Sequence, residues 1–222
     1  MSEVEEAACP ACAKPVRIEV YYSINGQRRA DLRAAILGDT LGRQACPHCA
    51  VAFRLEPRLS YVDPSRGEWL LIEPIASQDA WKDLEGAADD LFDRTFGPIA
   101  PGPAREIGRR LSRRVTFGWA GLREKLICGH LGIDDVALEV VKTTILRAGG
   151  PIPLADGVEL RLTAAEATTL TLLWMVGTTG AALEELVVPR ALLADVAAPA
   201  FQPLRDALSL GAFVDLHRLL AA

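Results

Sequence analysis

The chain has 222 residues, of which 50% are hydrophobic and 24% are charged, and its formal net charge is −5. This balance is typical of a globular protein and excludes a largely disordered chain. The net acidic charge gives no general indication of nucleic-acid binding. The acidic first residues lack the apolar core of a signal peptide, and the longest apolar stretch, 170–176, is far below the roughly 20 residues that span a bilayer. We therefore expect a cytoplasmic protein without a membrane partner, in which thiols stay reduced.

The first 76 residues show the pattern of a small sheet with one short helix. Apolar and polar residues alternate between Val16 and Ile24, which predicts a half-buried strand before the Asn25-Gly26 turn. Asp31 is placed to cap a short helix that ends at Gly38. Further strands are predicted at 51–55 and near 69–72.

From residue 77 onwards the periodicity becomes helical. Apolar residues at helical spacing follow Trp81 until Gly97-Pro98 ends the run, and prolines stiffen the connector at 97–103. We expect a short basic helix over 105–115, because Ile107 and Val115 lie on one apolar stripe with Leu111. Two more helices are predicted at 122–128 and 134–148.

Beyond Gly149-Gly150-Pro151, which has the composition of a linker, the pattern is mixed. Alternation over 158–162 predicts a short strand. Thr163 and Glu166 have capping-box spacing, which predicts a helix that ends near Val176, and short helices are expected from there to the C-terminus. The fold class is therefore α+β, with a zinc-ribbon-like unit and small antiparallel sheet at 1–76, a helical segment at 77–150 and a mainly helical subdomain at 151–222.

Four of the five cysteines occur in two Cys-Pro-x-Cys motifs, at 9–12 and 46–49. A tight turn of this spacing holds two thiolates on one side of a metal ion, and two such turns complete a tetrahedral set. A set of four cysteines leaves no open coordination position, so we expect a structural Zn²⁺ ion as the cofactor. The predicted ligands are Cys9, Cys12, Cys46 and Cys49.

The alternative for these cysteines is thiol–disulfide chemistry. Cys46-Pro47-His48-Cys49 is a sequence found in the active sites of strongly oxidising thioredoxin-like enzymes. Their first cysteine lies at a helix N-terminus, where the helix dipole lowers its pKa. Residues 50–55 alternate like a strand instead, and a second copy of the motif has no part in that mechanism. Oxidoreductase activity is therefore the least favoured hypothesis.

The chain resembles the CpXC family of bacteria and archaea, which is named for its two Cys-Pro-x-Cys motifs. The matching segments are 9–12, 23–25, 31–37, 46–49 and 61–63, and the resemblance extends through 122–126 and 132–135 to Lys142. It implies that the four cysteines named above are the metal ligands, and it implies no reaction. Glycine usually follows each cysteine pair in this family, whereas Ala13 and Ala50 stand there in this chain. Alanine with a positive φ costs about 1 kcal/mol, so strained turns are expected.

A second candidate site is a cluster of arginines in an otherwise acidic protein. Residues 98–125 carry seven basic residues against two acidic ones. Their arginines form a face that can contact phosphates or an acidic partner, or that the acidic residues of 83–93 can neutralise internally. The candidate contact residues are Arg105, Arg109, Arg110, Arg113 and Arg114.

These features support three functions, of which a non-enzymatic interaction or adaptor protein is favoured. Its expected partner is another protein or a second copy of this chain. The first alternative is a regulator that binds nucleic acid through the zinc unit and the basic helix. The second alternative is the oxidoreductase.

Overall fold

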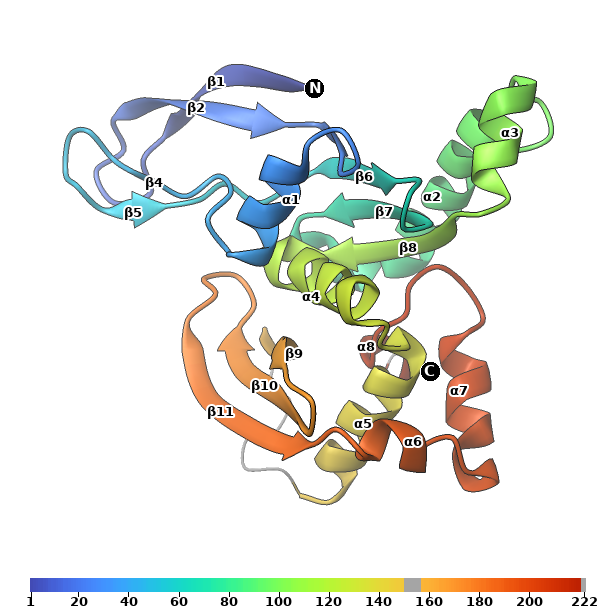
Figure 1. Ribbon diagram of the computed structural model, residues 1–222. Helices are drawn as coiled ribbons and strands as arrows, with labels where there is room; N and C mark the ends of the chain where they lie inside the picture. The colour runs from blue at the N-terminus through green and yellow to red at the C-terminus, as the bar shows by residue number, and fades with distance from the viewer. Residues whose placement is uncertain (150–156, 221–222) are drawn as a thin grey trace.

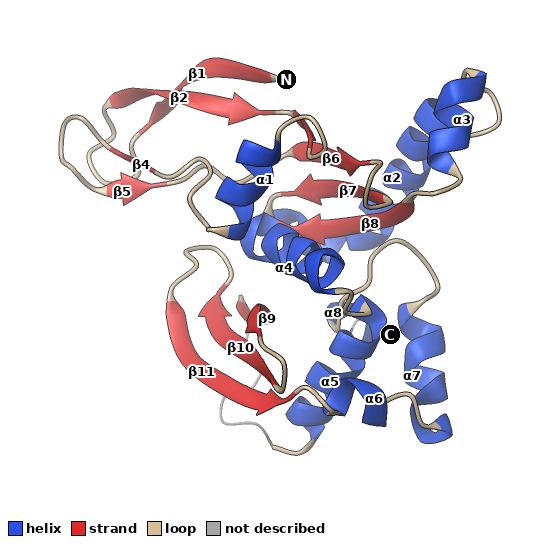
Figure 2. Ribbon diagram, in the orientation of Figure 1, coloured by secondary structure: helices blue, strands red, loops and turns tan. Residues whose placement is uncertain are grey.

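The computed structural model of the protein describes residues 1–149 and 157–220, and the order of its elements can be followed in Figures 1 and 2. The N-terminal unit consists of two short hairpins. Strands β1 (Ser2–Ala8) and β2 (Pro15–Tyr21) pair antiparallel, as do β4 (Gln44–Ala45) and β5 (Ala52–Phe53). Their shared core contains Cys9, Val16, Ile18 and Cys46, all of them buried.

A four-stranded mixed sheet forms the centre of the molecule, in the order β3-β6-β7-β8. Strands β6 (Leu59–Asp63) and β7 (Glu68–Glu73) pair antiparallel. The outer strands β3 (Ser23–Asn25) and β8 (Ser112–Phe117) each run parallel to their neighbour. The parallel pairings need crossover connections, and α1 (Ala30–Leu37) lies in the first of them.

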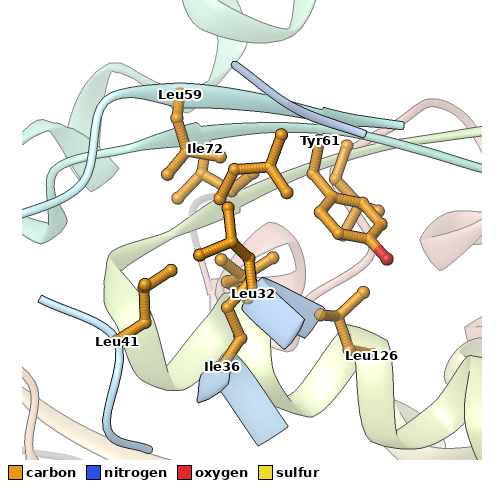
Figure 3. Packing of buried hydrophobic residues seen from close by; sticks show 10 residues of the cluster. Leu32, Ile36, Leu41, Leu59, Tyr61, Ile72 and Leu126 are labelled. Carbon is orange, nitrogen blue, oxygen red and sulfur yellow. The ribbon is translucent and has the colours of Figure 1, made fainter. Parts of the chain in front are cut away.

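Each face of the central sheet is covered by helices. On one face α1 and α4 (Gly118–Leu131) pack their apolar side chains onto the sheet, with Leu32, Tyr61 and Leu126 among the buried residues (Figure 3). On the other face lie a short 3-10 helix, η1 (Ile75–Ala80), and α2 (Trp81–Phe96). The helix α3 (Gly102–Gly108) packs beside α2, and together they project from the body (Figure 1).

The C-terminal part contains a second sheet and several short helices. Strands β9 (Val158–Ala165), β10 (Thr169–Val176) and β11 (Ala182–Pro189) form an antiparallel meander that packs against α4 through β9. The helices are α5 (Asp135–Arg147), α6 (Leu192–Asp195), η2 (Pro199–Phe201), α7 (Gln202–Leu208) and α8 (His217–Leu220). Among residues 1–149 and 157–220, no helix has the length and apolar character needed to cross a membrane.

The α+β class is confirmed, as are the helices predicted after Trp81 and Asp134. The short helix predicted to end at Gly38 is also present, but it begins at Ala30, so Asp31 lies in its first turn and does not cap it. Asp134 caps α5 by accepting a hydrogen bond from the backbone of Val136. The predicted linker at 149–151 lies, apart from Gly149, outside the described residues.

Two of the helix predictions made from the sequence are wrong. The segment predicted as a helix after Thr163 is strand β10, paired on both sides in the C-terminal sheet, so the segment from 157 onwards combines a sheet with short helices and is not mainly helical. The predicted basic helix over 105–115 is also wrong, because α3 ends at Gly108 and β8 begins at Ser112. Strand pairing overrides the local helical pattern in both places: β10 pairs with its chain neighbours β9 and β11, and β8 pairs with β7, which is distant in the sequence.

Candidate metal centre

The two cysteine pairs occupy equivalent turns at the tips of the two N-terminal hairpins. The amide of Cys9 donates to the carbonyl of Lys14, and the amide of Ala13 donates back to the carbonyl of Cys9, both at 2.9 Å. The second turn repeats this pattern: Cys46 donates to Val51 and Ala50 donates to Cys46, again at 2.9 Å. The Cys-Pro-x-Cys sequence therefore folds twice into the same hydrogen-bonded turn.

The hairpins bring all four sulfur atoms within 4.8 Å of one another. The Sγ atoms of Cys9 and Cys49 are 3.7 Å apart, and those of Cys12 and Cys46 are 3.8 Å apart. A tetrahedron with Zn–S bonds of about 2.3 Å has an edge of about 3.8 Å, so these separations fit a four-thiolate metal site. Both of these pairs join one hairpin to the other, so a bound ion would hold the two hairpins together.

Backbone amides around the sulfurs favour thiolate character. The amide of His48 lies 3.4 Å from Sγ of Cys46, whereas the His48 ring contacts the carbonyl of Pro15 and lies outside the sulfur cluster. Hydrogen bonds from the backbone of Cys12 lower the pKa of Cys9 to about 7 against the opposing effect of desolvation. At Cys49 the Val51 amide acts in the same direction, but desolvation and the three neighbouring sulfurs outweigh it and raise the pKa to about 12. Close thiols cannot all ionise without a cation, which is the charge that a divalent metal ion supplies.

The turns carry the backbone strain that the sequence predicts. Ala13 has φ of 57° and Ala50 has φ of 61°, both in the left-handed region that favours glycine. Alanine therefore stands at both positions in a backbone conformation that glycine adopts more readily.

The surroundings of Cys46 differ from those of an oxidoreductase cysteine. The residues after Cys49 form strand β5 and not the first turn of a helix. The helix dipole that lowers the pKa of a redox-active cysteine is therefore not available at this motif.

The five arginines of the second candidate site do not lie on one face. Arg105, Arg109 and Arg110 are exposed around the end of α3, at the opposite end of the molecule from the cysteines (Figure 1). Arg113 and Arg114 belong to β8 and are engaged by acidic side chains. Arg113 lies 3.0 Å from Asp89 of α2, and Arg114 lies 2.7 Å from Asp135.

One feature that the sequence prediction missed is a network of buried charges between α4, α5 and β9. Arg161 of β9 donates to Glu159, Glu124 and Asp215, and Lys142 of α5 donates to Glu124 and Glu139. The side chains of the six residues are at most 5% exposed. The sequence signal for this network was the presence of charged residues inside otherwise apolar segments. Their pairing could not be predicted, because the partners lie far apart in the sequence. The six residues are Glu124, Glu139, Lys142, Glu159, Arg161 and Asp215.

These features define a protein with a ribbon-like N-terminal unit, in which paired turns on two hairpins bring four cysteines together in a cluster that could hold one metal ion. The family model for CpXC proteins matches residues 7–142, and the chain belongs to this family. No curated protein and no solved structure matches the chain. The matched range includes the whole cysteine centre and ends at Lys142 of the buried network.

Proposed function

We propose that the four-cysteine centre holds a structural Zn²⁺ ion in a non-enzymatic adaptor protein. The observation that carries this proposal is the sulfur geometry, with inter-hairpin separations of 3.7 and 3.8 Å. A complete set of thiolates suits zinc and leaves no coordination position for a substrate. The ion would stabilise two hairpins whose own apolar core is small.

The projecting arm formed by α2 and α3 is the surface that we propose for a protein partner. Ile99 is 83% exposed and Ile107 is 38% exposed on this arm. A groove of about 260 Å³ is lined by Pro64, Pro103, Glu106, Ile107 and Arg110. Arg110 pairs with Glu106, whereas Arg105 and Arg109 are exposed nearby, so this surface suits a protein segment that carries both apolar and acidic side chains.

The metal assignment is tested by Cys46→Ser, with Cys128→Ser as its matched control. Cys128 is equally buried but lies in α4, outside the sulfur cluster. We expect about one zinc per chain in the wild type and in Cys128→Ser, and loss of zinc with a lower melting temperature in Cys46→Ser. Stoichiometric zinc and an unchanged melting temperature in Cys46→Ser would refute the assignment.

The adaptor role is tested by comparing the wild type with Ile107→Asp. Affinity purification from the native host, followed by reconstitution with the purified partner, should give a complex that Ile107→Asp weakens and that contains no nucleic acid. Sedimentation of the purified chain tests whether the partner is a second copy. If the chain instead binds DNA or RNA with a steep dependence on salt, and Arg109→Ala abolishes this binding, the adaptor proposal is replaced by the nucleic-acid-binding regulator.

A further inference from the structure

A cavity of about 410 Å³ lies between the metal-bearing hairpins, the start of α4 and the C-terminal sheet. The hairpins contribute Pro10 and Phe53, and the C-terminal sheet contributes Thr178 and its neighbours in the β10–β11 turn. Figure 1 shows that this turn lies on the side of the sheet that faces α4 and the hairpins. The volume is within the range of small-molecule sites, about 300–1,000 Å³.

The wall of this cavity carries more positive than negative charge. Arg43 and Arg54 both pair with one carboxylate, that of Asp39, and the Arg54 Nη1 atom lies 2.7 Å from it. Arg123 donates to the carbonyl of Leu37 at 2.8 Å, and within residues 1–149 and 157–220 no carboxylate pairs with it. These three arginines are therefore only partly neutralised by Asp39.

The other charged residues of the lining leave this excess in place. Arg161 is matched by the carboxylates of the buried network, as described above. Glu56 directs a carboxylate oxygen to the amide of Ile75 at 3.0 Å, and burial raises the pKa of this side chain. Even with Glu56 ionised, Arg43, Arg54 and Arg123 outnumber the two acidic residues.

Arg54 is held in place before any ligand arrives. Its guanidinium carbon lies 3.8 Å from the centre of the Trp119 ring, and its side chain is only 9% exposed. The Trp119 indole nitrogen donates to the carbonyl of Leu55 at 2.7 Å, which fixes the ring. The Arg54 Nε atom is buried and has no hydrogen-bond partner among the described residues. A guanidinium whose orientation is fixed by stacking is suited to an oxyanion.

The first turn of α4 adds a favourable dipole to the same cavity. Trp119 and Ala120 of this turn line the cavity, and among the described residues no side chain caps the helix at its N-terminus. The unpaired amides of a helix N-terminus stabilise negative charge, as arginines do.

We propose that this cavity binds a small phosphate-bearing molecule, held by Arg43, Arg54 and Arg123 beside the start of α4. The site is separate from the surface proposed for a protein partner. It depends on the metal centre only because the hairpins form one wall. Measurement of zinc content alongside phosphate binding therefore distinguishes failure of this site from failure of the metal assignment.

The test is a titration of the zinc-loaded protein with inorganic phosphate at constant ionic strength, followed by NMR. The reporters are the Arg54 Nε–H and Trp119 Nε1–H resonances. We expect both resonances to shift and saturate. Arg43→Gln should weaken binding about tenfold or more, because it removes a charge-assisted hydrogen bond. Arg28→Gln, at an exposed position outside the cavity lining, should bind like the wild type.

A parallel titration with malonate distinguishes phosphate from carboxylate recognition. Tighter binding of phosphate supports the proposal, whereas tighter binding of malonate overturns the phosphate assignment. Shifts that do not saturate, or that Arg43→Gln leaves unchanged, overturn the site itself. Arg54→Lys keeps the positive charge but loses the planar guanidinium that stacks on Trp119. Binding by this variant at wild-type affinity would therefore contradict the role given to Arg54.

Discussion

The Lys142 ammonium of α5 lies 2.7 Å from the Glu124 carboxylate of α4, and neither side chain is exposed to solvent. Glu139 completes the site at 2.8 Å from the same nitrogen. Two carboxylates close to one ammonium in a buried position stabilise its charged form, and the pKa of Lys142 is raised in spite of desolvation. The two helices are therefore joined by charge as well as by apolar packing.

Replacing Lys142 by methionine should destabilise the protein by about 3–5 kcal/mol, because two buried carboxylates lose their cation. Urea unfolding of the zinc-loaded protein measures this change. The matched control is Arg147→Met, at an exposed position on the same helix, for which we expect a change within about 0.5 kcal/mol. Equal unfolding midpoints for the two variants would show that the network contributes nothing to stability.

The same network shows why residues beyond the family match belong to the fold. Arg161 and Asp215 lie after residue 142, yet they neutralise charges that α4 and α5 bury. The amide of Leu216 also donates to Glu139 at 3.0 Å. The helices of the matched region thus have polar partners that only the C-terminal segment supplies.

The cysteine site was predictable from sequence because its signal is local. Each Cys-Pro-x-Cys motif specifies its own turn, and two matched turns need only be brought together. Local periodicity likewise gave α2 and α5, whose apolar residues recur at helical spacing. The residues that specify each of these elements lie close to one another in the sequence.

The errors arose where pairing between strands decides the structure. Thr163 and Glu166 have capping-box spacing, but Thr169 and Thr171 alternate with the buried Leu170 and Leu172, which is the signal of strand β10. The arginine-rich segment was read as one helix, whereas Arg113 pairs in register with Trp69 of β7. The cavity and the buried network depend on the same kind of long-range contact.

Stability should depend on pH through His217. Its Nδ1 atom lies 2.7 Å from the Asp215 carboxylate, which in turn pairs with Arg161. Burial alone would lower the pKa of His217, but the hydrogen bond and charge of Asp215 outweigh it and raise the pKa above the ordinary value of 6.5. The protonated ring therefore stabilises the folded state.

The sign of this effect follows from linkage. A group whose pKa is raised on folding contributes fully below its unfolded pKa, and the contribution is lost as the pH rises through the folded value. Relative to His217→Gln, the wild type should lose stability as the pH rises from 6.5 through the raised pKa of His217 in the folded protein. Urea unfolding of both zinc-loaded proteins across this range measures the difference. As a control, the stability of His130→Gln, at an exposed position at the end of α4, should change with pH as that of the wild type does. If the stability of His217→Gln also follows the wild-type curve, the assignment to His217 is contradicted.

Ala13 and Ala50, which have a left-handed backbone conformation in the two cysteine turns, lead to a prediction of increased stability. A non-glycine residue in this region costs about 1–2 kcal/mol, while the extra freedom of glycine in the unfolded chain costs about 0.4–1 kcal/mol. Ala13→Gly and Ala50→Gly should therefore each stabilise the protein by about 0.5–1 kcal/mol. Ala11→Gly is the matched control in the first turn, because Ala11 does not have a positive φ and should only lose stability. The measurement is urea unfolding with zinc content held at one per chain, and destabilisation of all three variants alike would show that the turns are not strained.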